Sequence, residues 1–313
     1  MADVVLKNEA GEDVTYSGVA GINLLNADGT TLTFTQDNCI CNKGAVPYGK
    51  ELPYTWAELS EIVKTGDFTG INIGDYKTIT LDGGETVVCE VAGIDTYYNR
   101  SYEGCEPGDG YYPCDQHHID FISRDCLTTT DYVIYNDGHE DPETGDWIVS
   151  NNGTSAQRNP FMASQLYQTL NNTTDGLITK LPADLRNIII NKQAYMEARY
   201  SSSALLDKNS GMTWCNMGPL WLPTEFEVWG RHTYSEAGPN GVNSGCNIQY
   251  PIFKNGLQHI LKGYGNAGGV DDWWLASAAV GNSDCFCFVN YDGYAFYDFA
   301  DYTFLVPLCF RIG

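Results

Sequence analysis

The hydrophobic pattern of this chain predicts many short strands separated by turns, with a few helices among them. Residues 55–66 carry a clear helix signal: Thr55 and Glu58 form a capping box, apolar residues follow at helical spacing, and Gly66 closes the segment. Strands are predicted at residues 73–81, 87–93, 119–122 and 132–135, the first two as a hairpin. Further helices are predicted to begin at Asn159-Pro160, Leu181-Pro182 and Pro223-Thr224. The mixture predicts an α+β fold.

Residues 1–38 read as a small β-rich unit of their own. Strand-like pieces at 4–6, 14–16, 22–24 and 31–34 alternate with turn compositions. A unit of this size cannot bury enough apolar surface alone, so it must pack on the larger domain or on copies of itself. We therefore predict an N-terminal assembly segment at 1–38, through which the chain can form homo-oligomers, and a main domain at 39–313.

Residues 284–304 combine many aromatic side chains with Asp, Asn, Ser, Gly and Ala, which is the composition of antibody binding loops. The alternative is an aromatic core, but core strands favour Val, Ile and Leu at a constant period, and these rings keep none. Phe286 and Val289 are the expected core members. The predicted ligand-binding residues, mostly on one partly exposed face, are Asp284, Phe288, Tyr291, Tyr294, Phe296, Tyr297, Phe299, Asp301, Tyr302 and Phe304.

Two apolar segments flank this stretch and are expected to hold it in place. Trp273, Trp274 and Leu275 should be buried at its start. At its end, Phe310 should lie in the core and Arg311 should pair with a carboxylate. Gly293 permits a tight turn between them, so the stretch is predicted to fold back on itself as two strands or loops.

The same stretch lacks a specific set of amino acids. Glu, Gln, Lys, Met and Trp occur throughout the rest of the chain, yet none occurs from Ala279 to Leu305, where the composition predicts about four. These are the residues that cannot be reached by substituting the adenines of an Asn codon. In this respect the chain resembles the variable proteins of diversity-generating retroelements, which implies a variable region at about 279–309.

Six weak markers along residues 50–313 occur in the order found in a bacterial and phage domain family. They are Thr55-Trp56, Ile73-Gly74-Asp75 with Lys77 and Leu81, Leu181-Pro182, Trp221-Leu222-Pro223-Thr224-Glu225, Asp272-Trp273-Trp274-Leu275, and Val306-Pro307 with Phe310-Arg311. The chain thereby resembles proteins of C-type lectin-like fold, with the formylglycine-generating enzymes as the nearest well-known branch. One departure is Leu308-Cys309, where the family often has a small residue before Phe-Arg.

The resemblance implies an adhesin on a phage tail or a bacterial surface. Its variable residues would contact a host cell-surface protein or glycan. Two other functions stay open, an enzyme of the formylglycine-generating type and a structural virion or surface protein without a specific ligand.

Charge and hydropathy exclude several classes of partner. The formal net charge of −23 disfavours nucleic acid, which requires a basic surface, and it disfavours anionic lipid equally. No apolar run reaches the length of a membrane span, so membrane insertion is not expected. The opening residues Met1-Ala2-Asp3 resemble no signal peptide, which predicts folding in a cytoplasm.

Catalytic and metal-binding signals are weak. The 11 cysteines are odd in number, and the groups Cys39-Ile40-Cys41 and Cys105 with Cys114, His117 and His118 do not repeat the paired spacing of a zinc site. Asp- and Gly-rich loops admit Ca²⁺, but no EF-hand spacing occurs. The 5 histidines are scattered without a nucleophile at motif spacing, although Cys285 or Cys309 would be the reactive thiol of an enzyme. We predict no cofactor, no metal and no enzymatic activity.

Overall fold

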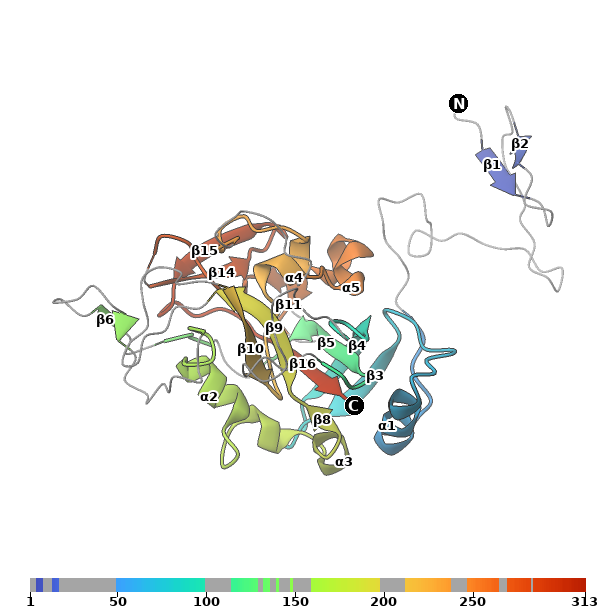
Figure 1. The fold of residues 1–313 in the computed structure, drawn as a ribbon, viewed down its shortest axis with the longest axis horizontal. Coiled ribbons are helices and arrows are strands. Elements are labelled where there is room, and N and C mark those ends of the chain that lie inside the picture. Colours follow the sequence, from blue (N-terminus) through green and yellow to red (C-terminus); the bar gives the residue numbers. More distant parts are fainter. Residues whose placement is uncertain are drawn as a thin grey trace. The chain divides into compact units, whose positions relative to one another are not determined.

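The chain was analysed as a computed structural model (Figure 1). It describes residues 4–7, 13–16, 49–98, 114–128, 132–135, 139–140, 147–148, 159–197, 212–237, 247–264, 269–282 and 284–313. The chain divides into two compact units, residues 1–47 and 48–313. In the first, β1 (Val4–Lys7) pairs antiparallel with β2 (Asp13–Tyr16). The strands predicted at 22–24 and 31–34 lie outside the described residues, and the boundary after residue 38 stays a prediction.

The larger unit is built on a five-stranded antiparallel sheet in the order β3-β4-β5-β16-β8. Its strands are β3 (Tyr76–Thr80), β4 (Thr86–Ile94), β5 (Ile119–Cys126), β16 (Pro307–Ile312) and β8 (Ile189–Ile190). The last strand of the chain is therefore an inner strand, and all of its residues are buried. This position fixes the end of the aromatic stretch to the core.

A second, three-stranded antiparallel sheet has the order β13-β14-β15. It consists of β13 (Trp273–Ala278), β14 (Cys285–Val289) and β15 (Ala295–Phe299). Shorter ladders join β9 (Lys192–Glu197) to β10 (Met212–Gly218), β11 (Lys262–Gly263) to β12 (Val270–Asp271), and β6 (His139–Glu140) to β7 (Trp147–Ile148). Together with its helices, the described chain is an α+β protein with antiparallel sheets.

Helix α1 (Trp56–Thr65) forms as its sequence predicts. The Thr55 hydroxyl accepts the backbone N–H of Glu58, the Glu58 carboxylate accepts the backbone N–H of Thr55, and Gly66 ends the helix at φ 70°. Trp56, Leu59 and Val63 face the core. The other helices are α2 (Gln165–Asn171), η1 (Leu177–Lys180), α3 (Ala183–Arg186), α4 (Glu225–Trp229), α5 (Pro251–Lys254) and η2 (Leu257–His259).

Three predicted elements differ in the structure. The helix expected from Asn159-Pro160 begins only at Gln165, because the Asn159 side chain accepts the N–H of Phe161 in a turn and Ser164 caps α2 instead. The helix expected at Leu181-Pro182 was predicted to run through Ile189, but it ends at Arg186, and Ile189 begins strand β8.

The segment 132–135 is not a strand. The N–H groups of Ile134 and Tyr135 both donate to the carbonyl of Ala300, and only Tyr132 forms a bridge, with Phe304.

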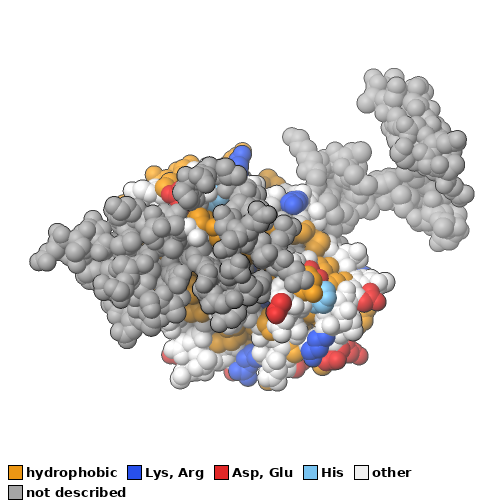
Figure 2. All heavy atoms as spheres, in the orientation of Figure 1, with side chains coloured by type: hydrophobic (Ala, Val, Ile, Leu, Met, Phe, Trp, Pro, Cys, Tyr) orange, Lys and Arg blue, Asp and Glu red, His pale blue; other side chains and the backbone are white. Residues whose placement is uncertain are grey.

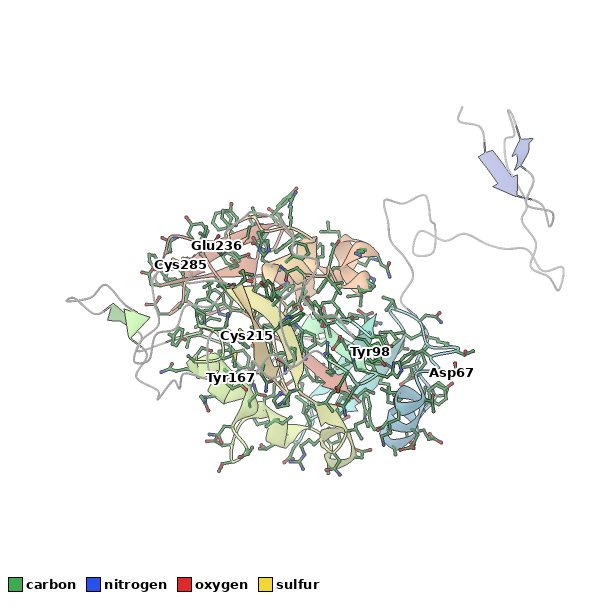
Figure 3. The ribbon with its side chains drawn as sticks, viewed as in Figure 1. Asp67, Tyr98, Tyr167, Cys215, Glu236 and Cys285 are labelled. Carbon is green, nitrogen blue, oxygen red and sulfur yellow. The ribbon has the colours of Figure 1, made fainter. Side chains whose placement is uncertain are left out.

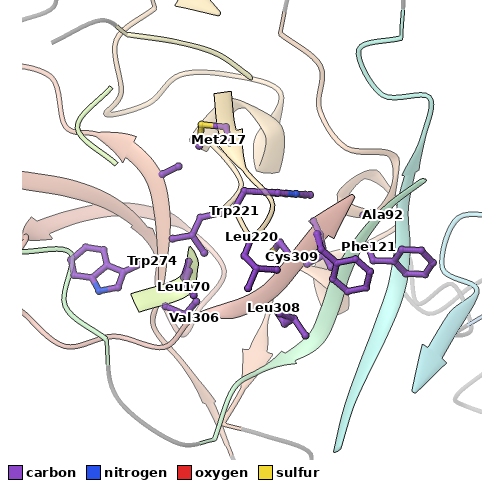
Figure 4. Packing of buried hydrophobic residues seen from close by; sticks show 14 of the residues in the cluster. Ala92, Phe121, Leu170, Met217, Leu220, Trp221, Trp274, Val306, Leu308 and Cys309 are labelled. Carbon is purple, nitrogen blue, oxygen red and sulfur yellow. The ribbon is translucent and has the colours of Figure 1, made fainter. Parts of the chain in front are cut away.

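The hydrophobic core surrounds β16, with Trp274 towards one side and Phe121 towards the other in the view of Figure 4. The flanking segments are buried as predicted: Trp273, Trp274, Leu275 and Phe310 have no exposed surface. Arg311 pairs with a carboxylate as expected, since its Nε donates to Asp120 over 2.7 Å inside the core. The aromatic stretch is thus held at both ends by buried structure.

Candidate functional site

The aromatic stretch forms a hairpin, with β14 leading into β15 across residues 290–294. The Asn290 side chain accepts the N–H groups of Asp292 and Tyr294, and the Asn290 N–H donates to the carbonyl of Tyr294 over 2.9 Å. Gly293 sits at φ 82°, where a side chain would be strained. A two-strand hairpin with its turn at Gly293 is what the sequence predicted.

The tip of the hairpin is tied to the rest of the domain. The Trp229 indole at the end of α4 donates to the carbonyl of Gly293 over 3.3 Å. A Cβ at Gly293 would lie 2.5 Å from a methyl carbon of Leu257, so the turn packs closely against η2. These contacts hold the turn against α4 and η2.

Six aromatic side chains of the hairpin and the segment after it are exposed, and we call them the aromatic surface. Their exposed fractions are Tyr291 61%, Tyr294 69%, Phe296 50%, Tyr297 36%, Phe299 47% and Tyr302 48%. In the space-filling view, hydrophobic side chains reach the surface at the upper left, where Figure 1 places β14 and β15 (Figure 2). Exposed apolar surface gathered in this way is typical of an interaction site.

The other four predicted site residues lie differently. Asp301 is exposed, and Asp284 and Phe304 are half-buried. Phe288 is buried, contrary to the prediction, because β14 is the middle strand of its sheet and its ring packs between Trp274 and Phe304. Phe286 and Val289, the expected core members, are buried as predicted.

Tyr234 packs against the aromatic surface, although nothing in its sequence position pointed to this contact. Its ring centroid lies 5.9 Å from that of Phe296 and 5.1 Å from that of Tyr297. The rings of Phe296 and Tyr297 are 6.2 Å apart and nearly parallel. Side chains of successive strand residues leave the backbone on opposite faces of a sheet. The rings of Phe296 and Tyr297 nevertheless lie close to each other, and together with Tyr234 they form one cluster at β15.

Glu225 holds the loop that carries Tyr234. Its buried carboxylate accepts the backbone N–H groups of Thr233, Tyr234 and Ser235 and the hydroxyl of Ser235. Ser235 in turn bridges to Ala279, whose N–H donates to the carbonyl of Cys285. Figure 3 labels Glu236 of this loop and Cys285 of β14.

We predict that Glu225→Gln lowers the free energy of unfolding by about 2 kcal/mol. The amide has one acceptor oxygen instead of two, and its NH₂ group would face backbone donors that lose their partner in a buried place. Equilibrium unfolding in urea measures the change. Glu61→Gln is the matched control, because Glu61 lies in an exposed helix pair with Lys64 and should change stability very little. Equal stability of the two variants would contradict the assigned role of Glu225.

Acidic side chains are numerous in and beside the hairpin. Asp271, Asp272, Asp284, Asp292, Asp298 and Asp301 lie in or beside the hairpin, and residues 263–310 contain no Lys, Arg or His. The pKa of Asp272 is raised, first by burial and then by Asp271, Asp298 and Asp292, although the Tyr291 N–H that it accepts acts in the other direction. The surface is therefore aromatic and acidic.

The thiols of Cys285 and Cys309 are poor nucleophiles. Burial raises the pKa of Cys285 to about 12, with Asp284, Asp298 and Asp301 adding to the shift. Burial also raises the pKa of Cys309 far above its ordinary value. Both thiols are protonated at neutral pH, whereas nucleophilic cysteines require the thiolate.

The Cys and His side chains that resemble metal ligands in the sequence have other contacts where the structure describes them. His117 contacts the Asp95 carboxylate over 2.7 Å, and the ring of His118 lies between the carbonyls of Gln116 and Thr96. Cys114 is 3.2 Å from His118. Within the described residues no group of three or more His, Cys, Asp or Glu side chains could hold a metal ion. Cys39, Cys41 and Cys105 lie outside them.

Among the helices in the described part, none is long and apolar enough to cross a membrane. Comparisons of the chain with protein-family models, with curated proteins and with solved structures found no match.

Proposed function

We propose that this chain is a ligand-binding protein whose aromatic surface contacts a host cell-surface protein or glycan. The observation that carries the proposal is the exposure of six aromatic side chains on β15, the turn before it and the segment after it, while β13 and β14 of the same sheet are buried. Tyr and Phe provide large contact area at low conformational cost, and a rigid base lowers the entropy lost on binding.

The proposal includes a C-type lectin-like fold for the main domain and a place on a phage tail or a bacterial surface. Support comes from the order of the six sequence markers and from the antiparallel sheets of the domain, which contain Lys77 in β3, Trp273–Leu275 in β13 and Phe310-Arg311 in β16. The last marker, Phe310-Arg311, lies in β16, an inner strand of the five-stranded sheet.

The second part of the proposal is that a retroelement diversifies this chain. The burial of the side chains indicates which positions can vary. Residues of β14 are buried on both faces, whereas β15 and the turn before it are mostly exposed. Variation should therefore be tolerated at exposed positions such as Tyr291, Tyr294 and Phe299, and be costly at Cys287 and Val289. A near-copy of the codons for 279–309, differing at adenines and lying beside a reverse-transcriptase gene, would support this element, and its absence would remove it.

Binding to intact cells tests the main proposal. Fluorescently labelled protein is titrated against a panel of bacterial strains, and a strain that binds is used to compare variants. Tyr294→Ala and Phe296→Ala should each weaken binding by roughly 2 kcal/mol or more, since exposed aromatics dominate such interfaces. Tyr264→Ala, an exposed aromatic outside the hairpin, is the matched control. Unchanged binding by both hairpin variants would refute the proposal.

An enzyme of the formylglycine-generating type is the alternative, and its reactive group would be a thiol. We predict that Cys285→Ser and Cys309→Ser leave cell binding within about twofold, because the protonated thiols serve only as small apolar side chains. Titration on the same strain measures this. A turnover of any carbonyl or thiol substrate that one of these changes abolishes would favour the enzyme.

The N-terminal segment is proposed to serve assembly. We predict that removal of residues 1–38 leaves a folded domain that binds cells with the same affinity per molecule but sediments as a smaller species. Analytical ultracentrifugation and cell titration measure the two properties. If the shortened chain unfolds, the segment belongs to the core of the main domain.

A further inference from the structure

Strand β15 lies at the edge of its sheet, and the pairing with β14 shows which of its backbone groups face outward. The Asn290 N–H donates to Tyr294 O and the Ala300 N–H donates to Asp284 O, so these are hydrogen-bonded pairs. Such pairs alternate with non-bonded pairs along an antiparallel ladder. Phe288–Phe296 and Phe286–Asp298 are then bonded pairs, while the pairs of Ala295, Tyr297 and Phe299 with β14 are not.

The N–H and C=O groups of Ala295, Tyr297 and Phe299 therefore point away from β14. The backbone groups of Phe299 already have hydrogen-bond partners. Its N–H donates to the Asp298 carboxylate over 2.8 Å, and its carbonyl accepts the N–H of Tyr302 over 3.0 Å. In the part of the chain that the structure describes, no hydrogen bond engages the backbone of Ala295 or Tyr297 beyond this ladder. The edge thus offers two donors and two acceptors at the spacing of a strand.

Natural proteins block such edges with Lys, Pro or a bulge, because an open edge pairs with other chains. Residues 295–299 contain neither Lys nor Pro, and their register with β14 is continuous. The open groups belong to the strand that carries the exposed rings of Phe296, Tyr297 and Phe299. Main-chain bonds of this kind provide affinity, and the flanking side chains provide specificity.

Charge selects the kind of segment that fits. Asp292, Asp298 and Asp301 flank the edge, and residues 263–310 carry no basic side chain. A second copy of β15 would bring like charges together, whereas Lys or Arg on an added strand would meet opposite charge and aromatic faces. We propose that β15 binds an extended segment of a partner protein that carries Lys or Arg, by adding it to the sheet as a fourth strand.

This inference rests on the proposed binding function and specifies how the partner is recognised. A diversified protein must still attach to a partner when its side chains change. Main-chain pairing at Ala295 and Tyr297 meets this requirement, because it does not depend on the side chains at these positions. Variation would then change specificity without removing the basic mode of attachment.

Synthetic peptides test the inference on the full chain labelled with ¹⁵N-Ala and ¹⁵N-Tyr. The probes are an eight-residue peptide alternating Lys and Val, its counterpart with Glu in place of Lys, and a Lys-Val peptide with N-methyl groups on two adjacent central residues. At saturation the Lys-Val peptide should slow hydrogen exchange at the amides of Ala295 and Tyr297 at least tenfold. The Glu peptide and the N-methylated peptide should bind at least tenfold more weakly.

A matched pair of variants isolates the backbone contribution. Ala295→Pro removes one outward N–H without breaking a bond to β14, while Ala295→Ser keeps that N–H. The proline variant should bind the Lys-Val peptide at least fivefold more weakly than the serine variant. If it fails to fold, the N-methylated peptide still decides.

Several outcomes would overturn the inference. One is that the N-methylated peptide binds as tightly as the unmodified Lys-Val peptide. The others are that the Lys-Val peptide does not bind, or that it binds without slowing hydrogen exchange at the amides of Ala295 and Tyr297. Self-association of the full chain that Ala295→Pro abolishes would assign the edge to a second copy instead. Loss of cell binding in Tyr294→Ala and Phe296→Ala, together with failure of the peptide test, would leave the proposed function standing and remove only the edge-strand inference.

Discussion

Replacement of Arg311 by methionine is expected to lower the free energy of unfolding by about 3–5 kcal/mol, because it leaves a buried carboxylate without its cation. The guanidinium is fully buried, and its Nε and Nη2 donate to the two oxygens of Asp120 over 2.7 and 2.9 Å. Nη2 also donates to the carbonyl of Thr96 over 3.1 Å. Urea unfolding at neutral pH measures the loss.

The pH dependence identifies the cause of this loss. Burial raises the pKa of Asp120, but the charges of Arg311 and His118 outweigh it, so the pKa in the folded protein lies below its ordinary value. A carboxyl of this kind contributes stability above its unfolded pKa of about 4, and the contribution is lost as pH falls through the folded value. In Arg311→Met the buried carboxyl has lost its main cation, so acid relieves the cost of its charge. The stability difference between the two proteins should narrow as pH falls from 7 to about 3.

A double variant provides the control. Arg311→Met combined with Asp120→Leu removes both charges and should recover much of the lost stability, since a buried pair can often be replaced by apolar residues at little cost. A single variant as stable as the parent at pH 7, or a double variant less stable than the single one, would contradict the role assigned to the pair.

The parts of the fold that the sequence predicted well are those specified within a few residues. The capping boxes Thr55–Glu58 and Thr224–Glu227 mark the starts of α1 and α4, and a glycine ends each helix. Signals of this kind depend only on neighbours along the chain. They placed both helices without knowledge of the tertiary structure.

The burial of the aromatic hairpin could be predicted only in part. The sequences of β14 and β15 both carry phenylalanine at alternate or nearby positions, yet Phe288 is buried and Phe296 is half exposed. The difference arises because β14 lies between β13 and β15, while β15 has a neighbour on one side only. Strand order depends on a separate segment of the chain, so periodicity within 284–304 could not distinguish the two rings.

The support of the site was missed for a similar reason. Glu225 and Tyr234 lie more than fifty residues before the hairpin, and nothing in their spacing connects them to it. Glu225 serves three backbone donors at once. A long-range side-chain-to-backbone contact of this kind has no sequence period. Only the packing of the loop against β13 brings Tyr234 to Phe296 and Tyr297.

Trp274→Ala should have the second large effect, lowering the free energy of unfolding by about 3–5 kcal/mol and weakening cell binding at least tenfold. The Trp274 ring is fully buried, with the centroids of Phe304 and Phe288 at 4.5 and 6.1 Å. Phe288 in turn contacts Phe296, so the ring supports the aromatic surface from below. A cavity at this place would let both phenylalanines move inward and would disorder the rings that contact the ligand.

Trp274→Phe separates packing from hydrogen bonding. It retains most of the ring volume but loses the bond from the indole N–H to the carbonyl of Tyr132, 2.7 Å long, and should cost about 1–2 kcal/mol. Cell binding by this variant should stay near that of the parent. Both variants are compared at a temperature where circular dichroism shows each to be folded. Equal cell binding by folded Trp274→Ala and Trp274→Phe would show that the aromatic surface does not depend on the core beneath it. The turn at Gly293 and the ring of Tyr234 would then be sufficient to set its shape.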